Sequence, residues 1–301
     1  MTKFYPQRTA NEITVVLRKA GIAAFPVDVR AVATEISKAK YPDSPIAVIK
    51  GGVLPGFEGA LSPAPPGKKG WGIFYNSGLA SRGRINFTLG HEFGHYLLHR
   101  KAYPEGFQCS TEDMAAWESE YGLRENEANV FAATLLMPLD DFRGQIAANR
   151  RPDFDELGAC ADRYDVSLIA ATLRWLQYTA CRSMLVVSRD GFVLWARSSQ
   201  PALKSGLYFK TRNRPPIAIP AKSLAADTLA LSRSKSAREL DADAWLHQPC
   251  TEHLIVSDQY DFKLSLLHFP DADYIQDAVE DPVEDAADRM RRRNPGESWP
   301  S

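Results

Sequence analysis

One short motif constrains this chain more than any other feature: His91 and His95 are four positions apart, and Glu92 directly follows the first of them. Because successive residues of an α-helix are about 100° apart, positions i and i+4 lie on one face. Two imidazoles placed there can bind one metal ion, with Glu92 beside them as a general base for water. Apolar residues recur around the motif at helical spacing, namely Leu89, Phe93, Tyr96 and Leu97. The motif therefore predicts a metal-binding helix.

Two glycines, Gly90 and Gly94, lie inside this predicted helix. Each disfavours the helix by about 1 kcal/mol relative to alanine. A helix that served stability alone would rarely contain both. We therefore expect a close approach there, by a strand or by the backbone of a substrate.

A third protein ligand is expected from a second helix, which spans residues 124–138 and ends at Pro138. Glu125 and Asn129 share a face at i, i+4, so Glu125 can bind the metal while Asn129 hydrogen-bonds a ligand. Glu127 points elsewhere on the helical wheel and is the second choice for the ligand. Acidic residues in a first helical turn are also common without any metal, because the helix dipole favours them.

Residues 87–95 and 125–138 together resemble the ImmA/IrrE metallopeptidases, which have a zincin-like fold with a gluzincin-type third ligand. The resemblance implies that His91, His95 and Glu125 bind the metal and that Glu92 is the general base. Two nitrogens and one carboxylate suit zinc, with manganese or iron as alternatives because availability also decides which metal is loaded. The resemblance also implies cleavage of a helix-turn-helix repressor, and hence a role in transcription regulation and stress response.

The composition is that of an ordinary soluble protein of 301 residues. The net charge of −1 shows no overall excess of basic residues of the kind that general nucleic-acid binding requires. The start of the chain lacks the apolar run of a signal peptide, and no stretch approaches 18 apolar residues. The cysteines are widely spaced, without a C-x-x-C pair: Cys109, Cys160, Cys181 and Cys250. We therefore expect reduced thiols, a cytoplasmic location and no membrane contact.

The first domain is expected to span residues 1–138. Two helices are predicted first, over residues 9–20 and from Pro26 onward. Three short apolar runs then predict a small sheet beside the metal helix, at 46–49, 56–61 and 71–76. An extended peptide can pair with an edge strand. We predict residues 71–76 as that edge, with Trp71, Ile73 and Tyr75 contacting the substrate.

The segment after the motif is less regular. His99 repeats the i+4 spacing and is either a further polar group near the metal or a favourable charge at a helix end, the interpretation that we prefer. Residues 100–123 are expected as a loop that borders the cleft and can act as a lid. Tyr103 and Tyr121 are candidates for stabilising an oxyanion, but no spacing selects either.

Residues 139–180 are predicted as a helical segment with a helix-turn-helix outline, in which Ser167 caps the second helix. In a helix-turn-helix that reads DNA, the second helix presents Arg, Lys, Asn or Gln near its start. Here the corresponding residues are apolar: Leu168, Ile169, Ala170 and Ala171. The sequence therefore favours packing or substrate docking over DNA binding.

Residues 181–276 predict a small α+β domain. Asp190-Gly191 is the turn of a hairpin, two more strands fall at 253–256 and 262–267, and a short helix at 221–231. This half resembles, without a diagnostic motif, the small-molecule-binding GAF fold, so a small-molecule effector and a protein-docking surface are equal expectations. Residues 277–301 are highly charged and are expected to be a disordered tail.

The sequence as a whole predicts an α+β protein that acts as a metal-dependent endopeptidase on a partner protein. The main alternative is a metal-bound regulator that binds a partner or DNA and turns over little. The intact Glu92 argues against it, because a pure binder needs no carboxylate there. Hydrolysis of a non-peptide amide is a third possibility.

Overall fold

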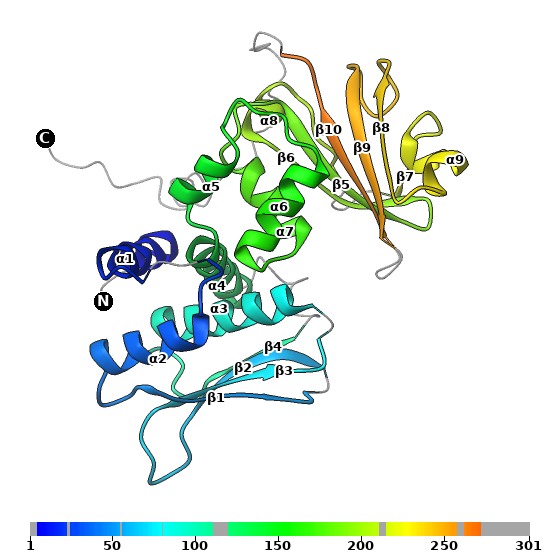
Figure 1. The fold of residues 1–301 in the computed structure, drawn as a ribbon. Coiled ribbons are helices and arrows are strands. Elements are labelled where there is room, and N and C mark those ends of the chain that lie inside the picture. The colour runs from blue at the N-terminus through cyan, green and yellow to red at the C-terminus, as the bar shows by residue number, and fades with distance from the viewer. Residues whose placement is uncertain are drawn as a thin grey trace, which may run out of the picture. The chain divides into compact units, whose positions relative to one another are not determined.

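The computed structural model divides the chain into two compact units, Met1–Tyr178 and Thr179–Ser301 (Figure 1). It describes residues 5–22, 25–54, 56–79, 81–110, 120–210, 215–257 and 262–271. The expected tail, and residues 111–119 of the expected lid, lie outside these ranges. The α+β class is confirmed for the residues described. Among those residues, no helix is long and apolar enough to span a bilayer.

The first unit contains a four-stranded sheet in the order β1-β3-β2-β4. β3 runs parallel to β1 and antiparallel to β2, and β2 is antiparallel to β4. The strands are β1 (Ile46–Gly52), β2 (Phe57–Pro63), β3 (Trp71–Asn76) and β4 (Phe107–Ser110). The helices α2 (Val29–Lys40) and α3 (Arg82–Leu98) lie over this sheet (Figure 1).

The prediction that residues 71–76 form the edge of the sheet is wrong. β3 is hydrogen-bonded on both sides, by β1 and by β2. Trp71 and Ile73 are buried, with 8% and 0% of their surface exposed, and Tyr75 is half-buried. A run this apolar is typical of a central strand, whose side chains pack against a core. The edge strand β4 was missed because it is short and lies in a segment read as a loop.

Helix α3 carries the metal motif. Ser81 caps its start, since the Ser81 side chain accepts a hydrogen bond from the backbone N–H of Arg84. Phe93 and Tyr96 are fully buried in the core of the unit. The helix ends at Leu98, and His99 is its C-cap. The motif is therefore anchored on a helix whose other faces are fixed by packing.

Helix α4 (Glu120–Leu136) runs beside α3 at short distance (Figure 1). A Cβ atom at position 94 would lie 3.0 Å from Cδ1 of Phe131 and 3.2 Å from Cα of Ala128. One at position 90 would lie 3.3 Å from Cβ of Ala132. The segment that approaches the two glycines is thus a helix, and not the strand or substrate expected. This approach brings the start of α4 to the metal face of α3.

The other helices of the first unit are α1 (Pro6–Lys19), α5 (Leu139–Gln145), α6 (Phe154–Tyr164) and α7 (Leu168–Leu176). The second helix begins at Val29 and not at Pro26, because the Asp28 side chain accepts from the backbone N–H of Ala31 and so caps it there. The predicted cap of α7 is confirmed: the Ser167 side chain accepts from the N–H of Ala170.

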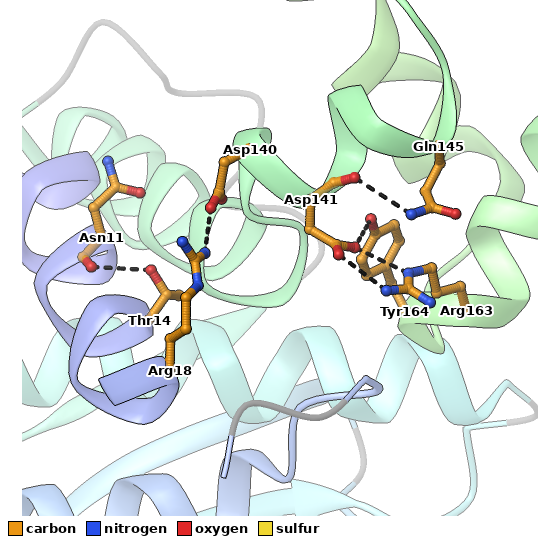
Figure 2. Close-up of polar contacts among 8 residues, drawn as sticks. All are labelled: Asn11, Thr14, Arg18, Asp140, Asp141, Gln145, Arg163 and Tyr164. Atoms are coloured by element: carbon orange, nitrogen blue, oxygen red, sulfur yellow. Dashed lines mark hydrogen bonds and ion pairs between the residues drawn. The ribbon is translucent and has the colours of Figure 1, made fainter. Parts of the chain in front are cut away.

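Polar contacts tie α1, α5 and α6 together around the end of α4 (Figure 2). The Asp141 carboxylate accepts two hydrogen bonds of 2.9 Å from Arg163 and one of 2.6 Å from the hydroxyl of Tyr164. Arg18 of α1 forms an ion pair with Asp140. These contacts fix α5, which directly follows α4, against its neighbours.

The second unit is built on a six-stranded antiparallel sheet with the order β7-β6-β5-β10-β9-β8. The predicted hairpin is confirmed, with Asp190 and Gly191 at positive φ between β5 and β6. The predicted pair of later strands is also found, as β9 and β10. The strands are β5 (Ser183–Arg189), β6 (Phe192–Ser198), β7 (Ile217–Ala218), β8 (Lys235–Leu240), β9 (Cys250–Ser257) and β10 (Phe262–His268). Short helices α8 (Gln200–Lys204), η2 (Leu224–Ala226) and α9 (Thr228–Leu231) complete it.

Candidate metal centre

Three ligand-type side chains converge where α3 and α4 meet. Nε2 of His91 lies 3.1 Å from Oε2 of Glu125, and Nε2 of His95 lies 3.1 Å from Oε1 of the same carboxylate. The two Nε2 atoms are 3.0 Å apart. All three residues are buried. Of the two carboxylates considered from the sequence, the structure brings Glu125 to the histidines, and it places Glu127 elsewhere.

This group fits a divalent metal ion. Zinc binds imidazole nitrogen and carboxylate oxygen at about 2.0–2.2 Å, so tetrahedral ligand atoms lie roughly 3.3–3.5 Å apart. The three observed separations, which involve both oxygens of Glu125, are only slightly shorter, and one ligand atom from each residue lies within 4.8 Å of the others. Two nitrogens and one oxygen are donors that zinc, manganese and iron all accept.

The charges of the group also favour a cation. Burial lowers the pKa of His91, but the hydrogen bond to Glu125 and the nearby carboxylates outweigh it, so that the pKa is raised above its ordinary value. Burial lowers the pKa of His95 to about 4. Burial would raise the pKa of Glu125, but the two histidines hold it well below its usual range. The group therefore stabilises one positive charge even when the only cation available is a proton.

The remaining nitrogen of each histidine also has a partner. Nδ1 of His91 lies 2.9 Å from Oδ1 of Asn129, which is the contact that the i, i+4 spacing with Glu125 predicts. Nδ1 of His95 lies 3.0 Å from Nδ1 of His99. The ring of His95 also stacks on Phe107 of β4, with 4.4 Å between ring centroids. Both imidazoles are therefore held in place by neighbouring side chains.

His99 has a different role from the one preferred on sequence grounds. It is buried, it contacts His95, and its Nε2 lies 2.9 Å from Oε2 of Glu127. Burial lowers its pKa, and the interaction with Glu127 opposes this. It is thus a polar neighbour of the candidate metal ligands. The i+4 spacing could have indicated this contact, but nothing local in the sequence links His99 to Glu127.

Glu92 is fully buried at the interface between α3 and β2. A Cβ atom at position 59 would lie 2.6 Å from Oε1 of Glu92 and 2.6 Å from Cγ2 of Thr88. Only a glycine lets β2 cross α3 at this distance. Gly59 therefore shapes the wall beside the Glu92 carboxylate, a feature that the sequence did not indicate.

Of the residues predicted to bind substrate, Trp71 and Ile73 are buried in the core at β3 and are not accessible to one. The edge strand beside the histidines is β4, and its Phe107 contacts both His95 and His99. Tyr103 accepts a hydrogen bond from Arg124, so its hydroxyl is engaged at α4. The side chain of Tyr121 lies outside the described part of the chain.

A pair of histidines and a glutamate on two packed helices is a ligand set of metallohydrolases. Residues 54–176 match the Peptidase_M78 family, described as an IrrE N-terminal-like domain. The segment contains every residue of the group, and the match confirms the resemblance to the ImmA/IrrE family. Its function is metallopeptidase-like, and the group formed by His91, His95 and Glu125 is suited to a divalent metal. No curated protein matches the chain.

Proposed function

We propose that the chain is a metal-dependent endopeptidase that uses zinc, bound by His91, His95 and Glu125. The observation that carries the proposal is the convergence of two imidazoles and a carboxylate: each Nε2 lies 3.1 Å from one oxygen of Glu125, and the two Nε2 atoms are 3.0 Å apart. Glu92, on the same helix as the two histidines, is buried next to them. A structural role alone does not explain why two imidazoles face a carboxylate in the core. A bound divalent ion would supply Lewis-acid polarisation of the peptide carbonyl and would acidify a water molecule.

Glu92 is the general base in this proposal. Its carboxylate would take a proton from the water whose oxygen attacks the carbonyl carbon. When the carbon–nitrogen bond breaks, Glu92 would return that proton to the leaving amine. The wall formed by Gly59 and Thr88 confines the carboxylate and keeps bulk water from it. Asn129 holds His91 through Nδ1, which leaves Nε2 directed at the centre of the group.

An extended segment of a protein is the proposed substrate. β4 pairs with β2 on one side, and within the described residues no strand pairs with its other side. A substrate strand can add there by main-chain hydrogen bonds, beside His95 and its neighbour Phe107. A helix-turn-helix repressor as substrate, cleaved in the cytoplasm to regulate transcription under stress, is proposed from the resemblance to the ImmA/IrrE proteases alone.

The second unit is proposed as a regulatory domain for a small-molecule effector, resembling the GAF fold. Its support is a separate core, in which Met184, Val186, Leu254, Leu267 and Phe269 are buried. A unit with a core of its own can respond to a ligand without disrupting the first unit.

The test compares wild type with Glu92→Gln, a substitution of nearly equal size. Each is loaded with zinc, its metal content is measured, and it is incubated with the helix-turn-helix regulator encoded nearest its gene. The proposal expects one zinc in both and cleavage by wild type alone. Metal in both, tight binding of the regulator and no cleavage by either would favour the non-catalytic regulator instead. Cleavage by both would exclude Glu92 as the base.

A further inference from the structure

We propose that His99 and Glu127 are positioning residues that fix the tautomer of His95, so that its Nε2 presents an electron pair to the metal. The inference rests on the proposed metal site and extends it to two residues beyond the ligands. The supporting observation is a continuous chain of contacts that runs from Glu125 through His95 and His99 to Glu127. Nε2 of His95 faces Glu125, Nδ1 of His95 lies 3.0 Å from Nδ1 of His99, and Nε2 of His99 lies 2.9 Å from Oε2 of Glu127.

The positions of the protons follow from the end of this chain. An ionised carboxylate only accepts hydrogen bonds, so Nε2 of His99 must donate to Glu127. A neutral His99 then has an electron pair on Nδ1, which accepts the Nδ1–H of His95. His95 is left with an electron pair on Nε2, the atom 3.1 Å from Glu125. The reverse arrangement would set an unprotonated Nε2 of His99 against the Glu127 carboxylate, which is repulsive. In the metal-free protein Glu125 acts against this at the other end of the chain, because it likewise accepts from a protonated Nε2 of His95; a metal ion bound at that Nε2 removes the opposition.

Packing holds the chain in this geometry. The His95 ring stacks on Phe107 with an interplanar angle of 23°, and Phe107 also contacts His99 at 5.8 Å between centroids. His95 and His99 are buried, whereas 46% of the Glu127 side chain is exposed. Glu127 is therefore the only member that can be replaced at little risk to the core.

The two metal histidines thus have unlike supports. Asn129 accepts from His91 directly, and its amide is uncharged. His95 is supported through a second imidazole that ends on a carboxylate. A carboxylate at the end of such a chain raises the basicity of the ligand nitrogen, as carboxylate–histidine pairs do at zinc sites. We therefore expect removal of Glu127 to weaken zinc binding although Glu127 does not touch the metal.

The experiment uses the full chain with 15N-labelled histidine, loaded with one equivalent of zinc, and reads the tautomer of His99 from long-range proton–nitrogen spectra. Zinc affinity is measured in parallel by competition with a chelator. Variants are Glu127→Leu, which removes the acceptor, and Glu127→Gln, which keeps an oxygen in the same place. His99→Phe removes both nitrogens but keeps a ring. Glu105→Leu removes an exposed carboxylate of the neighbouring loop and serves as the control.

With zinc bound, wild type, Glu127→Gln and Glu105→Leu are expected to carry the His99 proton on Nε2. His99→Phe and Glu127→Leu are expected to weaken zinc binding by about 10–100-fold. Glu127→Gln should stay below about tenfold, because its amide oxygen still accepts from His99. A His99 proton on Nδ1 in zinc-loaded wild type, or a zinc affinity of Glu127→Leu equal to that of Glu105→Leu, would overturn the proposal. Neither readout requires peptide cleavage, so a failure of the protease proposal would be seen separately.

Discussion

Each unit of this protein buries a glutamate, and the two carboxylates have opposite surroundings. Glu252, in the second unit, accepts hydrogen bonds from the N–H of Leu224, from Nε1 of Trp245 and from the hydroxyl of Ser265, at 2.6–2.8 Å. Glu125, in the first unit, faces Nε2 of His91 and Nε2 of His95, and Nδ1 of each ring already has another partner. Burial of an acid therefore does not mark a functional site. What distinguishes Glu125 is that its neighbours are potential ligands, whereas those of Glu252 are donors.

The comparison is tested most strongly by the matched variants Glu125→Ala and Glu252→Ala. Glu125→Ala removes one of three ligands, so zinc affinity should fall by more than the roughly 100-fold seen for supporting residues. Glu252→Ala should leave zinc affinity unchanged. Titration of the metal-free proteins with zinc in the presence of a competing chelator measures both. Equal affinities in the two variants would remove Glu125 from the ligand set.

For the free energy of unfolding, we expect the larger loss from Glu252→Ala and the smaller one from Glu125→Ala. Glu252→Ala leaves three buried donors without their acceptor, and each such loss costs about 1–3 kcal/mol. Partial rearrangement and hydration of the vacated space reduce the sum, so we expect about 2–3 kcal/mol. Urea unfolding followed by tryptophan fluorescence measures it, since Trp245 is one of the donors. A loss below about 0.5 kcal/mol would show that the carboxylate is not needed for the core of the second unit.

A smaller effect is expected from the glycines that bring α3 and α4 together. Gly94→Ala places a methyl group 3.0 Å from Phe131, and such overpacking costs about 1–3 kcal/mol, offset in part by the better helix propensity of alanine. Zinc binding should weaken as well, because Glu125 reaches α3 only through this approach. Gly158→Ala in α6 is the control, since no described atom outside the adjoining turns of its own helix lies within 4 Å of the added methyl, and it should stabilise by up to about 1 kcal/mol.

The smallest effect is expected at the ion pair between Arg18 and Asp140 (Figure 2). Both side chains are more than half exposed, at 56% and 54%. Arg18→Ala should therefore change the free energy of unfolding by less than about 1 kcal/mol, with unchanged zinc affinity. Thermal unfolding of the metal-free and zinc-loaded forms checks both values. A larger loss would mean that α1 supports the site more directly than packing suggests.

The sequence identified the site where the chemistry depends on local spacing. His91, Glu92 and His95 follow from one helix, and Glu125 with Asn129 follows from a second. The contact between these two helices, with Gly90 and Gly94 at it, depends on the tertiary structure and cannot be read from either segment alone. The sequence showed only that something approaches the glycines. The pairing of His99 with Glu127 is of the same kind, since each residue alone has an ordinary explanation at a helix end.

Strands and helix caps could be predicted from local sequence, but the order of the strands in the sheet could not. Ser167 and the Asp190-Gly191 turn act through their own neighbours, so local patterns sufficed. The position of residues 71–76 depends on which strands pair with them. The apolar run alone does not show which strands pair with it. β4 was missed for the opposite reason, because an edge strand of four residues carries little periodicity.

X-ray absorption at the zinc edge shows directly whether His91, His95 and Glu125 hold one metal ion. The full chain is loaded with one equivalent of zinc and its spectrum recorded. We expect nitrogen and oxygen ligands at about 2.0–2.2 Å, with scattering from two imidazole rings. A sulfur shell at about 2.3 Å, or a spectrum without imidazole scattering, would contradict it.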